Sequence, residues 1–137
     1  MLGGHSTGTG SGKNNIVIAL LDEDFNIEKK VFVNGSATET MTDLKVDPAG
    51  NIVIVGTTTS VTAGSTDGLF MVFDPDLNIK TQHTFGGTGA DSYASVYVNN
   101  VGNYLIAGTT SSAYTGQNAF VLNLVGKVAD LHGSIEK

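Results

Sequence analysis

The stretches Asp22-Glu23-Asp24-Phe25-Asn26-Ile27 and Asp74-Pro75-Asp76-Leu77-Asn78-Ile79 decide the fold, because the second repeats the first 52 residues later. With this shift, residues 22–60 fall on residues 74–112 without a gap, and 13 of the 39 pairs are identical. Composition alone would give about three identities. The chain therefore contains an internal repeat, which is typical of solenoids and propellers.

The other identities lie where a β-protein turns or ends a strand. Gly50-Asn51 matches Gly102-Asn103, and Gly56-Thr57-Thr58 matches Gly108-Thr109-Thr110. The same phase extends toward both ends, so the sequence predicts about two and a half repeats in one domain. We divide it into a partial unit over 1–33, a full unit over 34–85 and a full unit over 86–137.

Each unit is expected to contain four strands. Residues 92–99 alternate Tyr93, Ser95 and Tyr97 with small or aliphatic residues, which is the period of a strand. Residues 51–55 and 69–73 are apolar on both faces and should be covered on both sides. No stretch shows helical periodicity. The remaining strands of the last unit are expected at 103–109, at 118–124 and, more weakly, at 127–135.

These features predict an all-β fold of antiparallel four-stranded propeller-type blades, since short strands at this spacing are typical of propellers. The composition agrees, with 18 Gly, two Pro, no Cys and only 15% charged residues. The apolar strand positions should be mostly buried. They are Val46, Ile52, Ile54, Leu69, Met71, Phe73, Val96, Val98, Leu105, Ala107, Phe120 and Leu122.

Charge and hydropathy exclude some partners. The net charge is −6 and all seven basic residues are Lys, with Lys29 and Lys30 the only adjacent pair, so we expect no nucleic acid. No apolar run approaches the ~20 residues that span a bilayer, so we expect no membrane insertion. Residues 1–5 lack the basic and apolar parts of a signal peptide, so a secretion signal would lie outside this chain.

The order of motifs resembles the bacterial and archaeal β-propeller repeats of large surface and secreted proteins, often called SBBP-type repeats. The motifs are Phe85-Gly86-Gly87, the turn Gly102-Asn103, Ala107-Gly108-Thr109-Thr110-Ser111 and Asn118-Ala119-Phe120-Val121. The first full unit departs from the pattern, with Val33-Asn34-Gly35 in place of aromatic-Gly-Gly. The resemblance implies an extracellular or cell-surface location and a scaffold or binding role rather than an enzyme.

The stretch Gly8-Thr9-Gly10-Ser11-Gly12-Lys13 superficially resembles a phosphate-binding loop. That motif needs Gly where Thr7 stands and Ser or Thr where Asn14 stands. No helix is predicted after it, so no helix N-terminus would hold a phosphate. We interpret it as a loop between strands.

The triplets Asp22/Asp24/Asn26 and Asp74/Asp76/Asn78 have the oxygen spacing that opens a calcium loop. They lack the Gly at position six and the Glu at position twelve of an EF-hand. Asp and Asn also cap their own backbone in tight turns. A hairpin turn and a calcium site both remain open for them, and the turn is the preferred interpretation.

No catalytic, cofactor-binding or metal-ligating residue is predicted. The three histidines, His5, His83 and His132, are far apart and have no ligand at metal spacing. Asn34-Gly35-Ser36 fits the glycosylation pattern, for which chance is a sufficient explanation in so Asn- and Ser-rich a chain. The four glutamates are expected to serve solubility. They are Glu23, Glu28, Glu39 and Glu136.

Partial units would leave unpaired strand edges, which tend to associate. We therefore expect the chain to pair with further copies or with more of its own polypeptide. Two functions are carried forward: a non-enzymatic scaffold or binding module, and a self-assembling subunit that forms a ring or filament by strand exchange. An enzyme with its site at the mouth of a propeller is the least favoured alternative.

Overall fold

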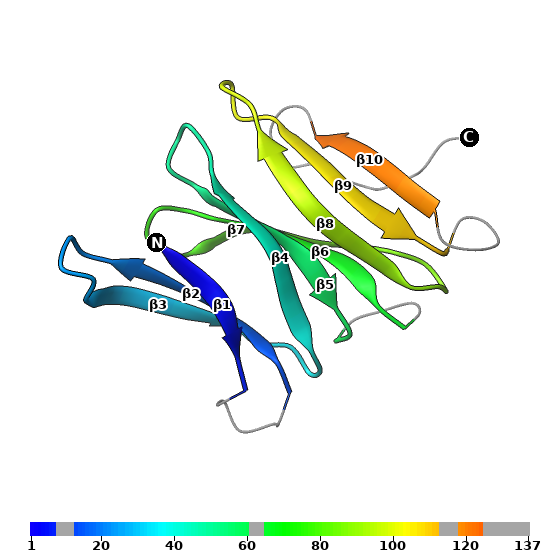
Figure 1. Ribbon diagram of the computed structural model, residues 1–137, viewed down its shortest axis with the longest axis horizontal. Coiled ribbons are helices and arrows are strands. Elements are labelled where there is room, and N and C mark those ends of the chain that lie inside the picture. Colours follow the sequence, from blue (N-terminus) through cyan, green and yellow to red (C-terminus); the bar gives the residue numbers. More distant parts are fainter. Residues whose placement is uncertain (8–12, 61–64, 113–117, 125–137) are drawn as a thin grey trace.

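The described part of the chain contains β-strands and turns but no helix, as the repeat predicts. The computed structural model describes residues 1–7, 13–60, 65–112 and 118–124, and no helix occurs among them, so none there could cross a membrane. Figure 1 shows the strands arranged side by side in successive sheets. The strands are β1 (Leu2–Ser6), β2 (Asn15–Leu21), β3 (Ile27–Val33), β4 (Glu39–Val46), β5 (Ile52–Thr58), β6 (Asp67–Phe73), β7 (Ile79–Phe85), β8 (Asp91–Val98), β9 (Tyr104–Thr110) and β10 (Asn118–Leu124).

These strands form three antiparallel sheets. Sheet I has the order β1-β2-β3, sheet II the order β4-β5-β6-β7 and sheet III the order β10-β9-β8. An isolated parallel bridge between Thr66 and Ala90 connects sheets II and III. One of the two predicted complete four-stranded sheets is present. The fourth strand expected for the last unit, at 127–135, lies outside the described residues.

Sheet II is covered on both faces, which confirms the interpretation of its doubly apolar strands. Every residue of β6 is buried, and β5 is buried except for the half-buried Thr57. Alternate side chains on each strand point to opposite sides of the sheet, so one set packs on sheet I and the other on sheet III.

Figure 1 shows sheet II between sheets I and III, and its two faces belong to two separate cores. Toward sheet I, Ile54, Leu69 and Met71 pack with Ile16 and Ile18 of β2. Toward sheet III, the second core forms between strands β5 and β6 on one side and β8 and β9 on the other. Its buried members are Val53, Val55, Phe70, Val72, Tyr93, Val96, Tyr104 and Ile106.

The burial prediction is correct for six positions and wrong for two. Ile52, Ile54, Leu69, Met71, Phe73 and Val96 are buried. Val46 and Leu105 are exposed, because Val46 ends β4 and Leu105 faces away from sheet II. Val98, Ala107 and Phe120 are half-buried, and the side chain of Leu122 lies outside the described residues.

Four hairpins share one turn geometry. They begin at Asp22, Asp47, Asp74 and Asn99, and each ends four residues later at an Asn whose backbone C=O accepts from the first residue's N–H. The fourth residue of each turn has positive φ: Gly50 and Gly102 in two, Phe25 and Leu77 in the others. Gly adopts this conformation without strain, whereas a side chain with a Cβ does not.

Candidate functional site

The outward faces of sheets I and III are apolar but open, although their repeat equivalents in sheet II are covered. Leu2 of β1 is 61% exposed, whereas Ile54, one repeat later, is 0% exposed. Leu105 of β9 is 42% exposed, whereas Val53, one repeat earlier, is 0% exposed. The sheets that bury Ile54 and Val53 therefore have no counterparts over Leu2 and Leu105 among the described residues.

We define the sheet I outer face by Leu2, Gly4, Val17, Ala19 and Phe32. These residues line a hollow of about 510 Å³ on the side of sheet I away from sheet II. Of the described residues that line it, Lys30 alone carries a formal charge. The hollow is therefore suited to an apolar partner.

The edge of sheet I at β1 is also open. A Cβ built at Gly56 of β5 would overlap the backbone C=O of Thr40 on the neighbouring β4, at 1.9 Å. The same test at Gly108 of β9 meets the C=O of Ser92 on β8, at 2.1 Å. At Gly4, the equivalent position of β1, the described structure holds nothing within 4 Å. Among the described residues, no strand lies beside β1 where β4 lies beside β5 and β8 beside β9.

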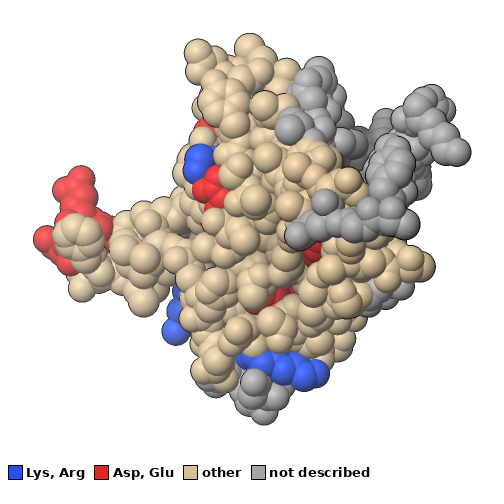
Figure 2. All heavy atoms as spheres, turned by 45° about the vertical axis from the view of Figure 1, so that its right-hand side comes forward, with Lys and Arg blue, Asp and Glu red and all other residues tan. Residues whose placement is uncertain are grey.

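The sheet III outer face is defined by Ser95, Tyr97, Leu105 and Ala107, which face away from sheet II. Tyr97 is 62% exposed, and its cross-strand neighbour is Leu105. Figure 2 shows that Lys, Asp and Glu form only small separate groups on the visible surface, between large uncharged areas. An uncharged aromatic and aliphatic pair on an open sheet is the composition of an interface centre.

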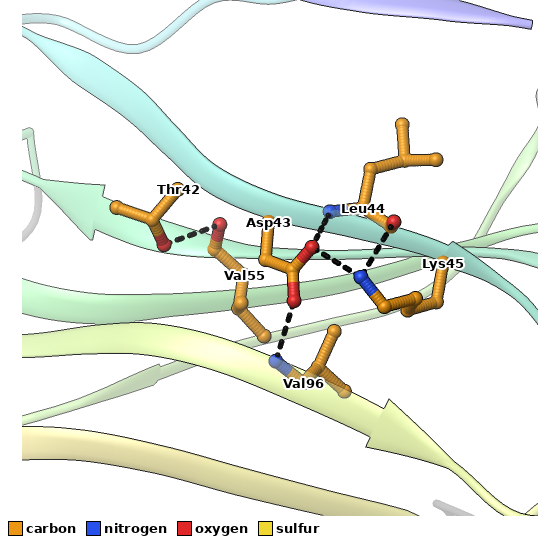
Figure 3. Close-up of polar contacts among 6 residues, drawn as sticks. All are labelled: Thr42, Asp43, Leu44, Lys45, Val55 and Val96. Carbon is orange, nitrogen blue, oxygen red and sulfur yellow. Dashed lines mark hydrogen bonds and ion pairs between the residues drawn. The ribbon is translucent and has the colours of Figure 1, made fainter.

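Polar side chains fix the spacing between sheets II and III at the strands where each sheet begins. The ladder of β4 shifts register between Met41 and Asp43, and that of β8 between Tyr93 and Ser95. Asp43 Oδ2 accepts the backbone N–H of Val96 at 3.0 Å (Figure 3). The hydroxyl of Thr42 donates toward the C=O of Val55 at 3.2 Å and toward that of Tyr93 at 2.8 Å. The bulge of β4 thus supplies partners for backbone groups of β8.

Asp43 is held in its ionised form. Burial raises the pKa of this carboxyl, but hydrogen bonds from the Lys45 ammonium and from the N–H groups of Val96 and Leu44 bring it below the usual value. Lys45 Nζ lies 2.6 Å from Asp43 Oδ1 (Figure 3). Asp43 therefore acts as a structural acceptor between sheets.

Two buried acids occupy the start of β4 and of β8. Glu39 is 3% exposed, which corrects the expectation that each glutamate serves solubility. Its Oε2 accepts the N–H of Gly35 at 2.8 Å, and its Oε1 accepts the hydroxyls of Thr58 and Ser60. Asp91 stands one repeat later and is 1% exposed.

Asp91 has a related but smaller set of partners. Its Oδ2 accepts the N–H of Gly87 at 2.9 Å and the hydroxyl of Ser112. Burial raises the pKa of Asp91, but hydrogen bonds, chiefly from the hydroxyls of Ser112 and Thr110, lower it by more. The pKa of Asp91 therefore lies below its usual value.

A polar cleft of about 580 Å³ lies between hairpins of sheets II and III. Asp47 Oδ2 accepts the hydroxyl of Tyr104 at 3.0 Å and the amide of Asn51 at 2.7 Å. Asn51 Oδ1 in turn accepts Lys80 Nζ at 3.0 Å. These four side chains satisfy one another, so the cleft is built as a structural junction.

The pKa values of the cleft reflect this network. Burial raises the pKa of Asp47, but the hydrogen bonds from Asn51 and Tyr104 lower it below the usual value. Burial and the bond to Asp47 raise the pKa of Tyr104 to about 12. A phenol with so high a pKa stays protonated at neutral pH and serves as a donor.

The residues of the candidate calcium triplets form the hairpin turns that the sequence predicts. Asp22 Oδ1 accepts the N–H groups of Asp24 and Asn26 at 2.9 and 2.8 Å, and Oδ2 accepts the Asn26 amide. Asp74 makes the same bonds in its own turn. In both turns, the hydrogen bond from the Asn side chain is the main cause of a lowered Asp pKa.

The other residues singled out by sequence have structural contacts or lie apart. His5 Nε2 accepts the N–H of Met41 at 2.9 Å, and His83 is half-buried on β7, so the structure does not bring them together. Lys29 Nζ donates to the C=O of Asp76 and so links sheets I and II. Asn34 is exposed. Residues 8–12, His132 and Glu136 lie outside the described residues.

The sequence analysis missed the buried acids Glu39, Asp47, Asp67 and Asp91 and the half-buried Asp43. The available signal was the repeat itself, since Glu39 and Asp91 are equivalent and Asp47 opens the same five-residue turn as Asp22. Within the described part of the chain, no group of three or more His, Asp or Glu is close enough to hold a metal ion.

Comparison with known proteins gives no further assignment. No protein-family model matches the sequence, and no curated protein matches it significantly.

Proposed function

We propose that this chain is a non-enzymatic β-repeat scaffold that associates, through its outer sheet faces, with sheets of the same kind. One observation supports this above all: Leu2 and Leu105 are exposed on the outer faces of sheets I and III, whereas their repeat equivalents in sheet II, Ile54 and Val53, are fully buried. The chain already shows how such faces are covered, because sheet II packs against sheet I on one face and against sheet III on the other.

The occupant that fits best is a second copy of the chain, joined head to tail. In the chain, the face of sheet II that contains Ile54 packs on the opposite face of sheet I. By equivalence, the sheet I outer face would pack on the sheet III outer face of the next copy. Such a contact is heterologous and leads to a ring or an open filament.

The open edge of β1 supports strand exchange as part of this assembly. Gly4 stands at the repeat position of Gly56 and Gly108, which β4 and β8 approach closely, and no described residue lies within 4 Å of a Cβ built at Gly4. A strand added there would satisfy the exposed backbone groups of β1. A propeller-type arrangement is the closed form of such a stack. The extracellular or cell-surface location belongs to this proposal and rests on the SBBP-type resemblance.

The absence of an enzymatic role is likewise proposed from what three buried or half-buried acids do. Glu39, Asp43 and Asp47 each accept hydrogen bonds that join strands or sheets. Used in this way, they stabilise the scaffold instead of facing a substrate.

The test is the mass in solution as a function of protein concentration, by multi-angle light scattering or sedimentation. The wild type should exceed the mass of one chain, and Leu105→Lys should shift it toward the monomer. Val101→Lys is the matched control, because Val101 is 79% exposed on a turn and belongs to neither outer face. A wild type that stays monomeric at all concentrations, or equal effects of the two variants, would contradict the proposal.

A further inference from the structure

The junction between sheets II and III differs from that between sheets I and II in its charge. At the first junction, Asn15, Asn34 and Glu39 stand where the second has Asp67, Gly86 and Asp91. Asn15 and Asp67 are 3% and 4% exposed, so both positions are buried. One buried carboxylate at the first junction therefore corresponds to two at the second.

The two carboxylates of the second junction are neighbours. A Cβ built at Gly86 would lie 2.3 Å from Asp67 Oδ1 and 2.8 Å from Asp91 Oδ2. The two oxygens can be no further apart than the sum of these distances. A side chain at position 86 would overlap both carboxylates unless they shifted.

Asp91 carries a second, independent sign of a missing ligand. Donors reach both oxygens of Glu39, whereas the donors placed on the shorter Asp91, the Gly87 N–H and the Ser112 hydroxyl, both reach Oδ2. Asp91 Oδ1 is fully buried and has no hydrogen-bond partner within the described part of the chain. A buried carboxylate oxygen without a donor is strongly unfavourable unless a cation or proton compensates it.

From this geometry we infer a calcium site at the sheet II–III junction, with Asp67 and Asp91 as its carboxylate ligands. Calcium is a hard cation that binds oxygen, and its flexible coordination of six to eight ligands can be completed by neutral oxygens and water. With only two carboxylates, the expected affinity is that of extracellular modules, with Kd roughly 10⁻⁴–10⁻³ M.

The site has a structural role. Asp67 begins β6 and Asp91 begins β8, so a shared ion would fasten sheet III to sheet II. At the equivalent junction of sheets I and II, Asn15 and Glu39 take these two positions, so only one carboxylate is present there. This inference is independent of the assembly proposed above.

The test is calcium titration of the full chain, after treatment with chelator, by calorimetry and thermal unfolding. The wild type should bind one ion and gain roughly 5–10 °C in Tm at calcium concentrations far above Kd. Asp67→Asn, which copies Asn15, should lose at least tenfold in affinity. Asp76→Asn, at an exposed turn position, should keep the wild-type response.

The outcomes separate the alternatives. Loss of binding in Asp67→Asn with retention in Asp76→Asn supports the site. A wild type without stoichiometric binding up to 10 mM (roughly ten times the weakest expected Kd) overturns it. The site would also be overturned if Asp67 and Asp91 shared a proton instead of an ion. In that case the free energy of unfolding would rise on acidification and would not change when calcium is added. If Asp67→Asn folds poorly, calcium binding to Asp91→Asn can be measured instead by calorimetry at 25 °C, and the same loss of affinity is expected.

Discussion

Strands β5 and β9 occupy the same position in successive repeats, yet one is buried on both faces and the other on one. Val53 of β5 is 0% exposed and Leu105 of β9 is 42% exposed. The difference does not come from the residues themselves, since both are aliphatic and both lie in an antiparallel ladder. It comes from the neighbouring sheet, which teaches that burial in a repeat protein depends on the next unit more than on the local pattern.

The largest expected effect is a truncation in the covered sheet. Ile54→Ala should lower the free energy of unfolding by about 2–5 kcal/mol, because it leaves a cavity at the centre of the sheet I–II core. Its repeat equivalent, Leu2→Ala, should change the stability of the monomer by less than about 0.5 kcal/mol. Urea unfolding of both variants measures the contrast. Equal losses would mean that Leu2 is already covered.

The inter-sheet acceptor Asp43 should matter more than its equivalent in sheet III. Asp43→Ala removes the partner of the Val96 N–H, and a buried unsatisfied donor costs about 1–3 kcal/mol. Ser95→Ala, one repeat later on the sheet III outer face, should be close to neutral. Chemical denaturation checks both, and a Ser95→Ala loss as large as that of Asp43→Ala would show that the two positions are used alike.

Acid should lower the free energy of unfolding through the Asp47 network of the polar cleft. The pKa of Asp47 is lowered in the folded state, so its ionised form contributes stability above the unfolded value of about 4, and this is lost as pH falls through the folded value. Tyr104→Phe removes the hydrogen bond from the Tyr104 hydroxyl to Asp47. It should lower the free energy of unfolding by about 1–2 kcal/mol at pH 7 and by less below pH 3. The control is Tyr97→Phe, on the exposed Tyr97, which should show no pH-dependent difference.

The smallest expected effect concerns the turns. Phe25 has φ 64° and is 83% exposed, so Phe25→Gly should stabilise the protein by up to about 1 kcal/mol. Leu77 has φ 61° but is 4% exposed, and Leu77→Gly should destabilise through lost packing. Differential scanning calorimetry resolves the sign. A loss in Phe25→Gly would show that the Phe25 side chain makes a stabilising contact.

Much of the fold follows from the sequence, because the repeat and the two-residue period act locally. Positions 52–55 and 69–73 are apolar at every step, which is why their double coverage was predictable. The exposure of Leu105 was not predictable, since nothing in its own strand distinguishes it from Val53. The same holds for Glu39: its burial depends on donors from Gly35, Thr58 and Ser60, which meet only in the folded chain.

The candidate site was less accessible to sequence reasoning than the fold. The spacing of Asp22, Asp24 and Asn26 suggested calcium, yet their oxygens serve a turn. Asp67 and Asp91 are 24 residues apart and belong to no local motif. Their proximity results from the packing of sheet III on sheet II, so only the three-dimensional structure could show it.

The central claim is that the sheet I outer face binds the sheet III outer face of another copy. Val17→Asp blocks the first face and Leu105→Asp blocks the second, so each variant alone should remain monomeric. Light scattering of an equimolar mixture measures the claim directly. We predict that the mixture forms a species of two chains, because each variant retains the face that the other has lost. A mixture that stays monomeric while the wild type assembles, or a single variant that still dimerises, would contradict the head-to-tail arrangement.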